Sequence, residues 1–240
     1  MAEPRKSYAL WLTGHILRFL FTLLIFAVCA LLIWRVFISG SLPKEMKQLA
    51  PNAPLAEAYR THGDALTLYT QEQNTLTRAD SNYGYFGVPR CVFIPQAQQI
   101  QVVFRYNNST LEHVQADFSL AEAPPRGVEI FDVTVVKVLD TTPEDKSDNT
   151  DDSPNLKKER IAPTDRRITT TLLYTYCLYT FDGAEMTPDT VAAFLDVYYG
   201  ETVDYNAAAY GTLRLYHCES ENLPATLSGK EEKALQAFAQ

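Results

Sequence analysis

The stretch Tyr8–Gly40, YALWLTGHILRFLFTLLIFAVCALLIWRVFISG, divides this chain of 240 residues into a short tail, an apolar segment and a domain of about 200 residues. Sixteen consecutive uncharged residues, Phe19–Trp34, form its centre. An α-helix rises about 1.5 Å per residue, so roughly 20 apolar residues cross the roughly 30 Å hydrocarbon layer of a bilayer. We therefore predict one transmembrane helix over residues 10–39.

Three side chains are candidate anchors at the membrane interfaces. Trp11 and Trp34 are the only tryptophans and stand 23 positions apart, which is about 35 Å of helix. Indole rings favour the two membrane–water interfaces, and Arg18 can extend its charge back toward the headgroups. The alternative, a buried helix of a soluble protein, needs an apolar environment on every side of the helix.

The apolar segment does not resemble a cleaved signal peptide. Its apolar run exceeds the 7–15 residues of a secretory signal, and Phe37-Ile38-Ser39 is a poor cleavage site. Basic residues flank the segment in nearly equal numbers, so the positive-inside rule decides little. We expect a cell-membrane protein with a single span, a cytoplasmic tail over residues 1–9 and an extracytoplasmic carboxy-terminal domain, because a long domain after a single first span is commonly translocated.

Composition limits the classes of partner. From residue 40 onward the chain holds 17 basic and 28 acidic residues, a net charge of −11. This balance argues against nucleic-acid binding and against a polybasic contact with anionic lipid. The expected partners are membrane lipid, through the one helix, and a protein or cell-envelope component. The 14 tyrosines and 12 phenylalanines favour a folded, β-rich domain.

The part after the span begins with helix signals. Pro43–Ala50 and Pro54–Arg60 read as two short helices, which predict a membrane-proximal stalk over residues 40–64. The β-rich domain is expected over residues 65–240, starting with a weak strand pair, Ala65–Thr70 and Thr75–Arg78. At its end, Ser228 and Glu231 form an S-x-x-E capping box that opens a short carboxy-terminal helix.

The clearest half-buried strand is Gln99–Tyr106, in which apolar residues alternate with Gln99, Gln101 and Arg105. Arg167–Phe181 is apolar on both faces, which predicts a long central strand. Further strands are predicted at Cys91–Ile94, Glu129–Leu139, Val191–Tyr199 and Gly211–Cys218, although VAAFL at the start of Val191–Tyr199 also suits a short helix.

These strands define the predicted fold class. Six or seven strands without a repeated strand–helix alternation indicate a mainly β domain, an antiparallel sandwich or barrel. We predict one antiparallel β-sandwich-like domain with a short carboxy-terminal helix. The Cys-Trp-Cys pattern of immunoglobulin domains is missing, because no tryptophan follows Trp34.

Two stretches are candidate contact surfaces. Asp140–Asp165 is acidic in its first half, lacks the glycine and spacing of a calcium loop, and predicts a mobile acidic loop. The glycine-punctuated stretch Asn82–Gly87 predicts either a turn packed on the core or a ligand-contact surface. In the second case Tyr83, Tyr85 and Phe86 are the binding residues.

Motifs for catalysis or metal binding are largely missing. The sequence has no G-x-S-x-G, P-loop, G-x-G-x-x-G, H-E-x-x-H or C-x-x-C, and its four histidines do not follow a metal-ligand spacing. We expect no metal and no cofactor. The domain is predicted to be a non-catalytic binding module.

One enzymatic alternative rests on a family resemblance. A single-span anchor, a β-rich domain and a late cysteine, with His113 preceding Cys177, resemble the sortases, which are cysteine transpeptidases. The resemblance implies a Cys177 thiolate beside His113 and an arginine that stabilises the oxyanion. The family's T-L-x-T-C stands here as Leu173-Tyr174-Thr175-Tyr176-Cys177, without its threonines in place, and the next arginine is the distant Arg214.

Three cysteines lie outside the predicted span, Cys91, Cys177 and Cys218. An odd number allows at most one disulfide. A Cys177–Cys218 bond requires neighbouring strands, and three free buried thiols are the alternative.

Overall fold

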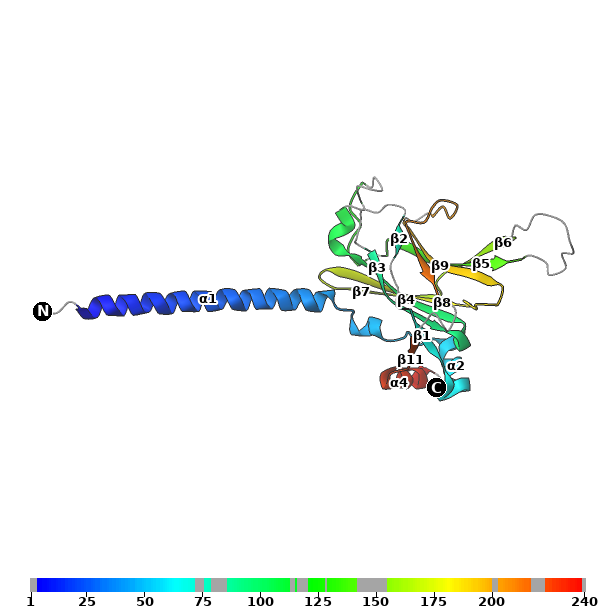
Figure 1. Ribbon diagram of the computed structural model, residues 1–240, viewed down its shortest axis with the longest axis horizontal. Coiled ribbons are helices and arrows are strands. Elements are labelled where there is room, and N and C mark those ends of the chain that lie inside the picture. Colours follow the sequence, from blue (N-terminus) through cyan, green and yellow to red (C-terminus); the bar gives the residue numbers. More distant parts are fainter. Residues whose placement is uncertain are drawn as a thin grey trace. The chain divides into compact units, whose positions relative to one another are not determined.

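The computed structural model describes residues 4–71, 76–78, 86–112, 115, 121–127, 129–141, 155–199, 203–216 and 223–238. The chain separates into two compact units, Met1–Ser41 and Leu42–Gln240. The first unit contains the helix α1, and the second contains the described strands and the remaining helices (Figure 1).

Helix α1, Pro4–Gly40, has the properties of a membrane span. Its section Trp11–Arg35 is 25 residues long, and the most apolar stretch of 18 residues within it has a mean hydropathy of 2.8 and is not buried. Apolar side chains project on all sides, as expected for a helix whose solvent is lipid. Inside it, the Thr22 hydroxyl donates to the carbonyl of Arg18 at 2.9 Å, so that this polar group needs no water. The helix is long and apolar enough to cross a membrane.

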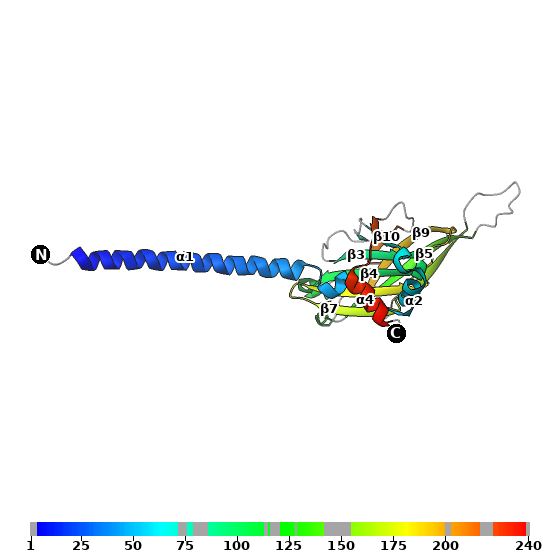
Figure 2. The same ribbon diagram turned by 90° about the horizontal axis from the view of Figure 1, so that it is seen from below.

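The second unit contains two antiparallel sheets, which confirms the predicted β-sandwich-like fold with a short carboxy-terminal helix (Figures 1 and 2). In order across it, sheet A consists of β11 (Leu223–Ala225), β1 (Leu68–Thr70), β3 (Phe86–Ile94), β4 (Gln99–Asn107), β8 (Tyr174–Asp182) and β7 (Asp165–Thr170). Sheet B consists of β2 (Thr77–Arg78), β10 (Gly211–Leu215), β9 (Thr190–Tyr199), β5 (Phe131–Asp140) and β6 (Leu156–Ile161).

The main core lies between the two sheets. Alternate residues of β4 and β8 face alternate residues of β5, β9 and β10, as the two-residue period of strands dictates. Phe131, the first residue of β5, packs in this core edge-on to Phe104, with ring centroids 5.5 Å apart, and to Phe86 at 4.7 Å. Each such buried ring contributes roughly 1.5–3 kcal/mol of transfer free energy.

A layer of short helices covers the other face of sheet A (Figure 1). Leu55 and Leu235 pack on Val92 and Ile94 of β3, while Met46 packs on the middle of β4 and β8. The layer and the connections comprise η1 (Lys44–Lys47), α2 (Ala53–His62), η2 (Gly63–Ala65), η3 (Pro95–Ala97), η4 (Asn108–Thr110) and α4 (Gly229–Phe238). Residues 42–62, expected in a stalk, therefore lie in the same compact unit as the strands.

This helical layer changes the environment of β4. The alternation in Gln99–Tyr106 predicted a polar face toward solvent, and that prediction is wrong. Gln99 and Gln101 are 0% and 1% exposed. The segment around Ala50 and Asn52 lies over them and forms hydrogen bonds with both amides, so these polar residues are buried at little cost.

The predicted long strand Arg167–Phe181 is instead a hairpin of β7 and β8. The turn between them closes through Thr171, whose N–H donates to the Tyr174 carbonyl at 2.8 Å. The Thr171 hydroxyl also accepts from the N–H of Tyr174 at 3.1 Å. The turn contains no glycine, proline or asparagine. The Thr171 side chain closes it instead.

Other local predictions were also corrected by the pairing. The strands near residues 68 and 77 do not pair, because β1 joins β3 and β11 while β2 joins β10. Residues 156–161, which the sequence placed in a loop, form the edge strand β6 against β5. Of the helix predicted over Pro43–Ala50, only the turn Lys44–Lys47 forms, since the chain is extended at Gln48.

Candidate functional site

A pocket of about 980 Å³ opens where β5 begins and β9 ends. We call it the Phe131 pocket. Its aromatic lining consists of Phe131, Tyr199 and Tyr205, and Pro124 and Pro125 line it as well. Large pockets lined by aromatic and apolar groups with a few polar side chains are typical of binding sites.

Strand pairing fixes the aromatic wall. Phe131 and Tyr199 are direct partners in the register of β5 and β9, with ring centroids 5.8 Å apart. Phe131 is also a core residue, so the wall is continuous with the rigid interior of the sandwich. Tyr205 comes from the connection between β9 and β10 and is 44% exposed.

Four charged residues line the same pocket: Glu122, Glu129, Asp132 and Arg166. Arg166 of β7 reaches across to Glu129, with Nη1 3.1 Å from Oε2. The Tyr205 hydroxyl donates to Asp132 Oδ2 at 2.5 Å, and this hydrogen bond is the main reason why the pKa of Tyr205 is raised. Glu129 Oε1 is buried, and its carboxylate lies beside the core residue Tyr179, where burial first and then the neighbouring Cys177 and Glu129 raise the pKa of the Tyr179 hydroxyl.

Arg160 of β6 holds Tyr205 in place from outside the pocket. Its guanidinium carbon lies 4.3 Å from the centre of the Tyr205 ring and 5.1 Å from that of Tyr198. Its Nη1 donates to the Thr134 hydroxyl at 2.8 Å, which fixes the plane of the guanidinium. The wall of the pocket thus already includes a cation–π contact.

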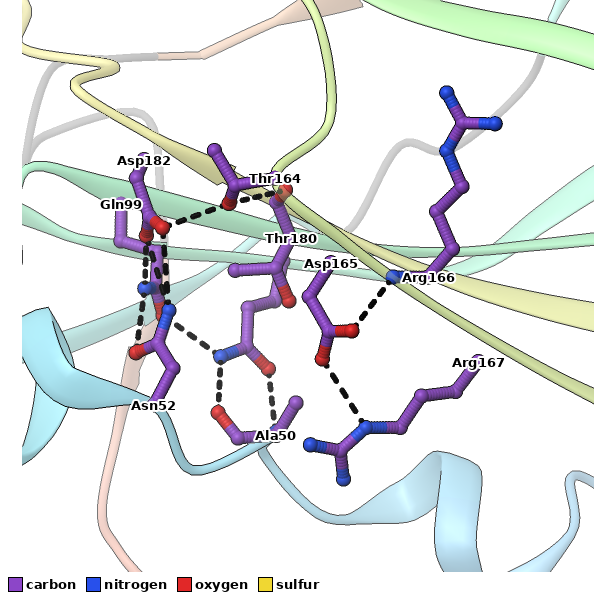
Figure 3. Close-up of polar contacts among 10 residues, drawn as sticks. Ala50, Asn52, Gln99, Thr164, Asp165, Arg166, Arg167, Thr180 and Asp182 are labelled. Carbon is purple, nitrogen blue, oxygen red and sulfur yellow. Dashed lines mark hydrogen bonds and ion pairs between the residues drawn. The ribbon is translucent and has the colours of Figure 1, made fainter.

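A second polar cluster lies beneath the helical layer (Figure 3). The Asp182 carboxylate accepts hydrogen bonds from Gln99 at 2.6 Å, from Thr164 at 2.7 Å and from Asn52 at 3.1 Å. Gln101 bonds to both backbone groups of Ala50, accepting from its N–H at 2.8 Å and donating to its carbonyl at 2.9 Å. These contacts fix residues 50–52 on sheet A, so we assign this cluster a structural role.

Glu231 joins the two ends of the second unit. Its Oε2 accepts from the N–H and hydroxyl of Ser228, which confirms the predicted capping box. Its Oε1 accepts from the N–H of Leu49 at 2.8 Å and lies 3.7 Å from Arg90 Nη2. One carboxylate therefore ties the segment after α1 to the carboxy-terminal helix.

The residues of the enzymatic alternative are placed as follows. Cys177 lies on β8 in the core between the sheets, 2% exposed, as a free thiol outside any disulfide. Burial raises the pKa of its thiol to about 12, and a protonated thiol is a poor nucleophile. His113 and Cys218 lie outside the described residues. Cys177 belongs to sheet A and β10 to sheet B, so the strand before Cys218 does not neighbour β8.

Of the three predicted binding residues, Tyr83, Tyr85 and Phe86, the structure describes Phe86. Phe86 is 9% exposed and packs on Phe104 and Phe131, so its ring serves the core. Tyr83 and Tyr85 lie outside the described residues, as does half of the predicted acidic loop, residues 142–154. Trp11, Arg18 and Trp34 all lie on α1.

Sequence reasoning did not single out the Phe131 pocket. Its charged residues come from three separate segments, which contain Glu122, Glu129 with Asp132, and Arg166, and they follow no motif spacing. The only sequence signal is indirect: Phe131 and Tyr199 are aromatic residues at the ends of two predicted strands. Pairing those strands in the correct register would have placed them side by side.

The described residues contain no group of three or more His, Cys, Asp or Glu side chains arranged to hold a metal ion. Comparison of the chain with protein-family models, curated proteins and solved structures finds no match.

Proposed function

We propose that this chain is a single-pass membrane protein whose β-domain lies outside the cytoplasm and binds a protein or cell-envelope component through the Phe131 pocket. The observation that carries the proposal is the pocket itself. It combines an aromatic wall, rooted in the core through Phe131, with charged side chains from three strands or connections. Because the core holds Phe131 in place, little side-chain entropy is lost there when a partner binds.

The membrane part of the proposal rests on α1. The span Trp11–Arg35 exposes large apolar side chains on every side, and a retained helix of this length tethers whatever follows it. The long domain after a single first span supports translocation of that domain. Protease treatment of intact cells tests the topology: digestion of the domain before lysis supports it, and protection until lysis contradicts it.

The binding proposal is favoured over the sortase-like enzyme by the state of Cys177. A transpeptidase needs an accessible thiolate. The thiol of Cys177 lies inside the sandwich, and its pKa of about 12 leaves it protonated at neutral pH. Replacing Cys177 by alanine is therefore expected to leave partner binding intact.

Site-specific photo-cross-linking tests the binding surface in living cells. A photoreactive amino acid placed at Tyr205, at the pocket rim, is expected to yield a discrete cross-linked product. The matched control places it at Lys233, which is exposed on α4 on the far side of sheet A. Equal products from both positions, or none at Tyr205 in protein that reaches the membrane, would contradict the proposed site.

A further inference from the structure

The turn between β7 and β8, Thr171–Tyr174, displays an apolar side chain on a fixed base. Leu172 in this turn is 49% exposed. The buried Asn108 holds the turn from η4: its Nδ2 donates to the Thr171 carbonyl at 2.9 Å, and its Oδ1 accepts from the Thr175 hydroxyl at 2.7 Å. A turn held in this way keeps Leu172 exposed until another surface covers it. We call these residues the Leu172 turn.

The chain enters the second unit at the same end of sheet A. Residues 42–52 run beside β8 in the same direction as that strand. At the far end, Asn52 donates to the Asp182 carboxylate. At the near end, Leu42 and Tyr174 both pack against the buried cluster that contains Met46. Leu42, the first residue of the second unit, therefore lies at the end of β8 where the Leu172 turn begins.

Chain length keeps this end of the domain close to the bilayer. The apolar span ends at Arg35, and Leu42 follows seven positions later. Seven residues extend about 10 Å as a helix and at most about 25 Å when fully extended. The headgroup layer is itself roughly 5–8 Å thick on each side of the bilayer. A tether this short makes docking intramolecular, so even a weak contact with lipid becomes populated.

The charges at this end suit a membrane surface better than those of the rest of the domain. Lys44 and Lys47 are exposed beside the Leu172 turn, and the acidic residue between them is Glu45. The Arg105 guanidinium carbon lies 4.6 Å from the centre of the Tyr174 ring. Basic and aromatic side chains favour the membrane interface. The chain from residue 40 has a net charge of −11, so anionic lipid repels its other faces.

From these observations we infer that the Leu172 turn docks on the surface of the membrane that α1 spans, with Leu172 inserted among the lipid headgroups. The inference rests on α1 as a membrane span, but it needs no partner in the Phe131 pocket. It goes beyond the proposed function by giving the domain a second attachment. Since Arg166 of β7 lines the Phe131 pocket, docking of this hairpin also fixes the direction in which the pocket faces.

Fluorescence quenching in vesicles tests the docking. The full chain, with Cys29 and Cys218 replaced by serine, is reconstituted into phosphatidylcholine–phosphatidylglycerol vesicles and labelled at Leu172→Cys with a polarity-sensitive fluorophore. The matched control is Leu156→Cys on β6 of sheet B, because Leu156 is 50% exposed. A nitroxide near the top of the lipid acyl chain is expected to quench the label at position 172 and leave that at position 156 bright. The emission at position 172 should also shift to the blue.

A pair of double variants tests the local charge. Lys44→Gln with Lys47→Gln is expected to reduce quenching at position 172. Lys157→Gln with Lys158→Gln makes the same change in net charge on β6, where both lysines are exposed, and is expected to leave quenching unchanged. Equal losses from the two pairs would refute the role given to the cations beside the turn.

Two other results would overturn the docking itself. One is equal quenching at positions 172 and 156. The other is quenching at position 172 by a nitroxide on the headgroup but not by one on the acyl chain, which indicates proximity without insertion. Failure of the inference can be told apart from failure of the proposed function. Loss of the chain from the vesicles on alkaline washing would refute the span and both proposals, whereas an embedded chain with an unquenched label at position 172 refutes this inference alone.

Discussion

The contact of Glu231 with Leu49 predicts that one carboxylate stabilises both ends of the β-domain. In the variant Glu231→Ala, the buried N–H of Leu49 loses the carboxylate oxygen to which it donates at 2.8 Å. Leaving a buried donor unsatisfied costs about 1–3 kcal/mol. The capping box at Ser228 is lost with it, at about 1 kcal/mol. Together these losses predict that Glu231→Ala lowers the free energy of unfolding by about 2–4 kcal/mol.

Arg90 adds a smaller contribution to this loss. It is partly buried, and burial is the main reason why its pKa is lowered, while Glu231 opposes that shift. Without Glu231 the guanidinium retains a long contact with the Met46 carbonyl, at 3.5 Å. The contribution stays modest, because the separation from Glu231 is already 3.7 Å.

The assay is urea unfolding of the full chain in a mild detergent. Near-ultraviolet circular dichroism of tyrosine reports on the domain, because both tryptophans lie in α1. A loss of about 2–4 kcal/mol corresponds to a fall in Tm of about 4–16 °C for a domain of this size. Hydrogen exchange at the Leu49 amide gives a second, local measurement and is expected to accelerate.

The control is Glu57→Gln on α2. Glu57 pairs with Arg60, but both side chains are mostly exposed, at 60% and 68%. Such a pair contributes at most about 1 kcal/mol. If Glu231→Ala destabilises the domain no more than Glu57→Gln, then Glu231 does not join Leu49 to α4, and the reasoning is refuted.

Three further predictions follow from burial. Gln101→Leu removes both hydrogen bonds to Ala50 and is expected to cost about 2–4 kcal/mol in the same urea assay. In a chain with Cys29 and Cys218 replaced by serine, Cys91 and Cys177 should resist an aromatic disulfide reagent until urea unfolds the domain; rapid labelling of the native protein would contradict their burial. The same two thiols, whose pKa rises from 9.0 to about 12, should make stability fall as pH increases from about 9 to 12. The unfolded chain loses these protons first, so the native state is favoured fully only below pH 9, and a flat unfolding free energy over this range would contradict the assignment.

The sequence allowed prediction of the elements that depend on local pattern. The apolar run Phe19–Trp34 predicted α1, because a helix that is apolar on every side is favourably surrounded by lipid. Alternation predicted β4, and the spacing of Ser228 and Glu231 predicted the start of α4. In each case the signal is contained within a few consecutive residues.

The tertiary structure alone decided which faces are buried. Gln99 and Gln101 looked solvent-facing, but the segment after α1 covers them and provides their hydrogen-bond partners. The hairpin of β7 and β8 was also hidden, because the Thr171 side chain closes a turn that has no turn residue typical of hairpins. The pairing of β2 with β10 depends on contacts between residues that are far apart in the sequence.

The same division applies to the candidate site. The sequence by itself determined that the chain contains one helix able to span a membrane and an acidic, aromatic-rich β-domain. Only the tertiary structure brought Glu129, Asp132, Arg166 and Tyr205 around Phe131, and only it buried Cys177. The physical reason is that a repeat of two or 3.6 residues indicates which side of a strand or helix is apolar. A pocket depends instead on strand order and register, and these arise from contacts between elements that are distant along the chain.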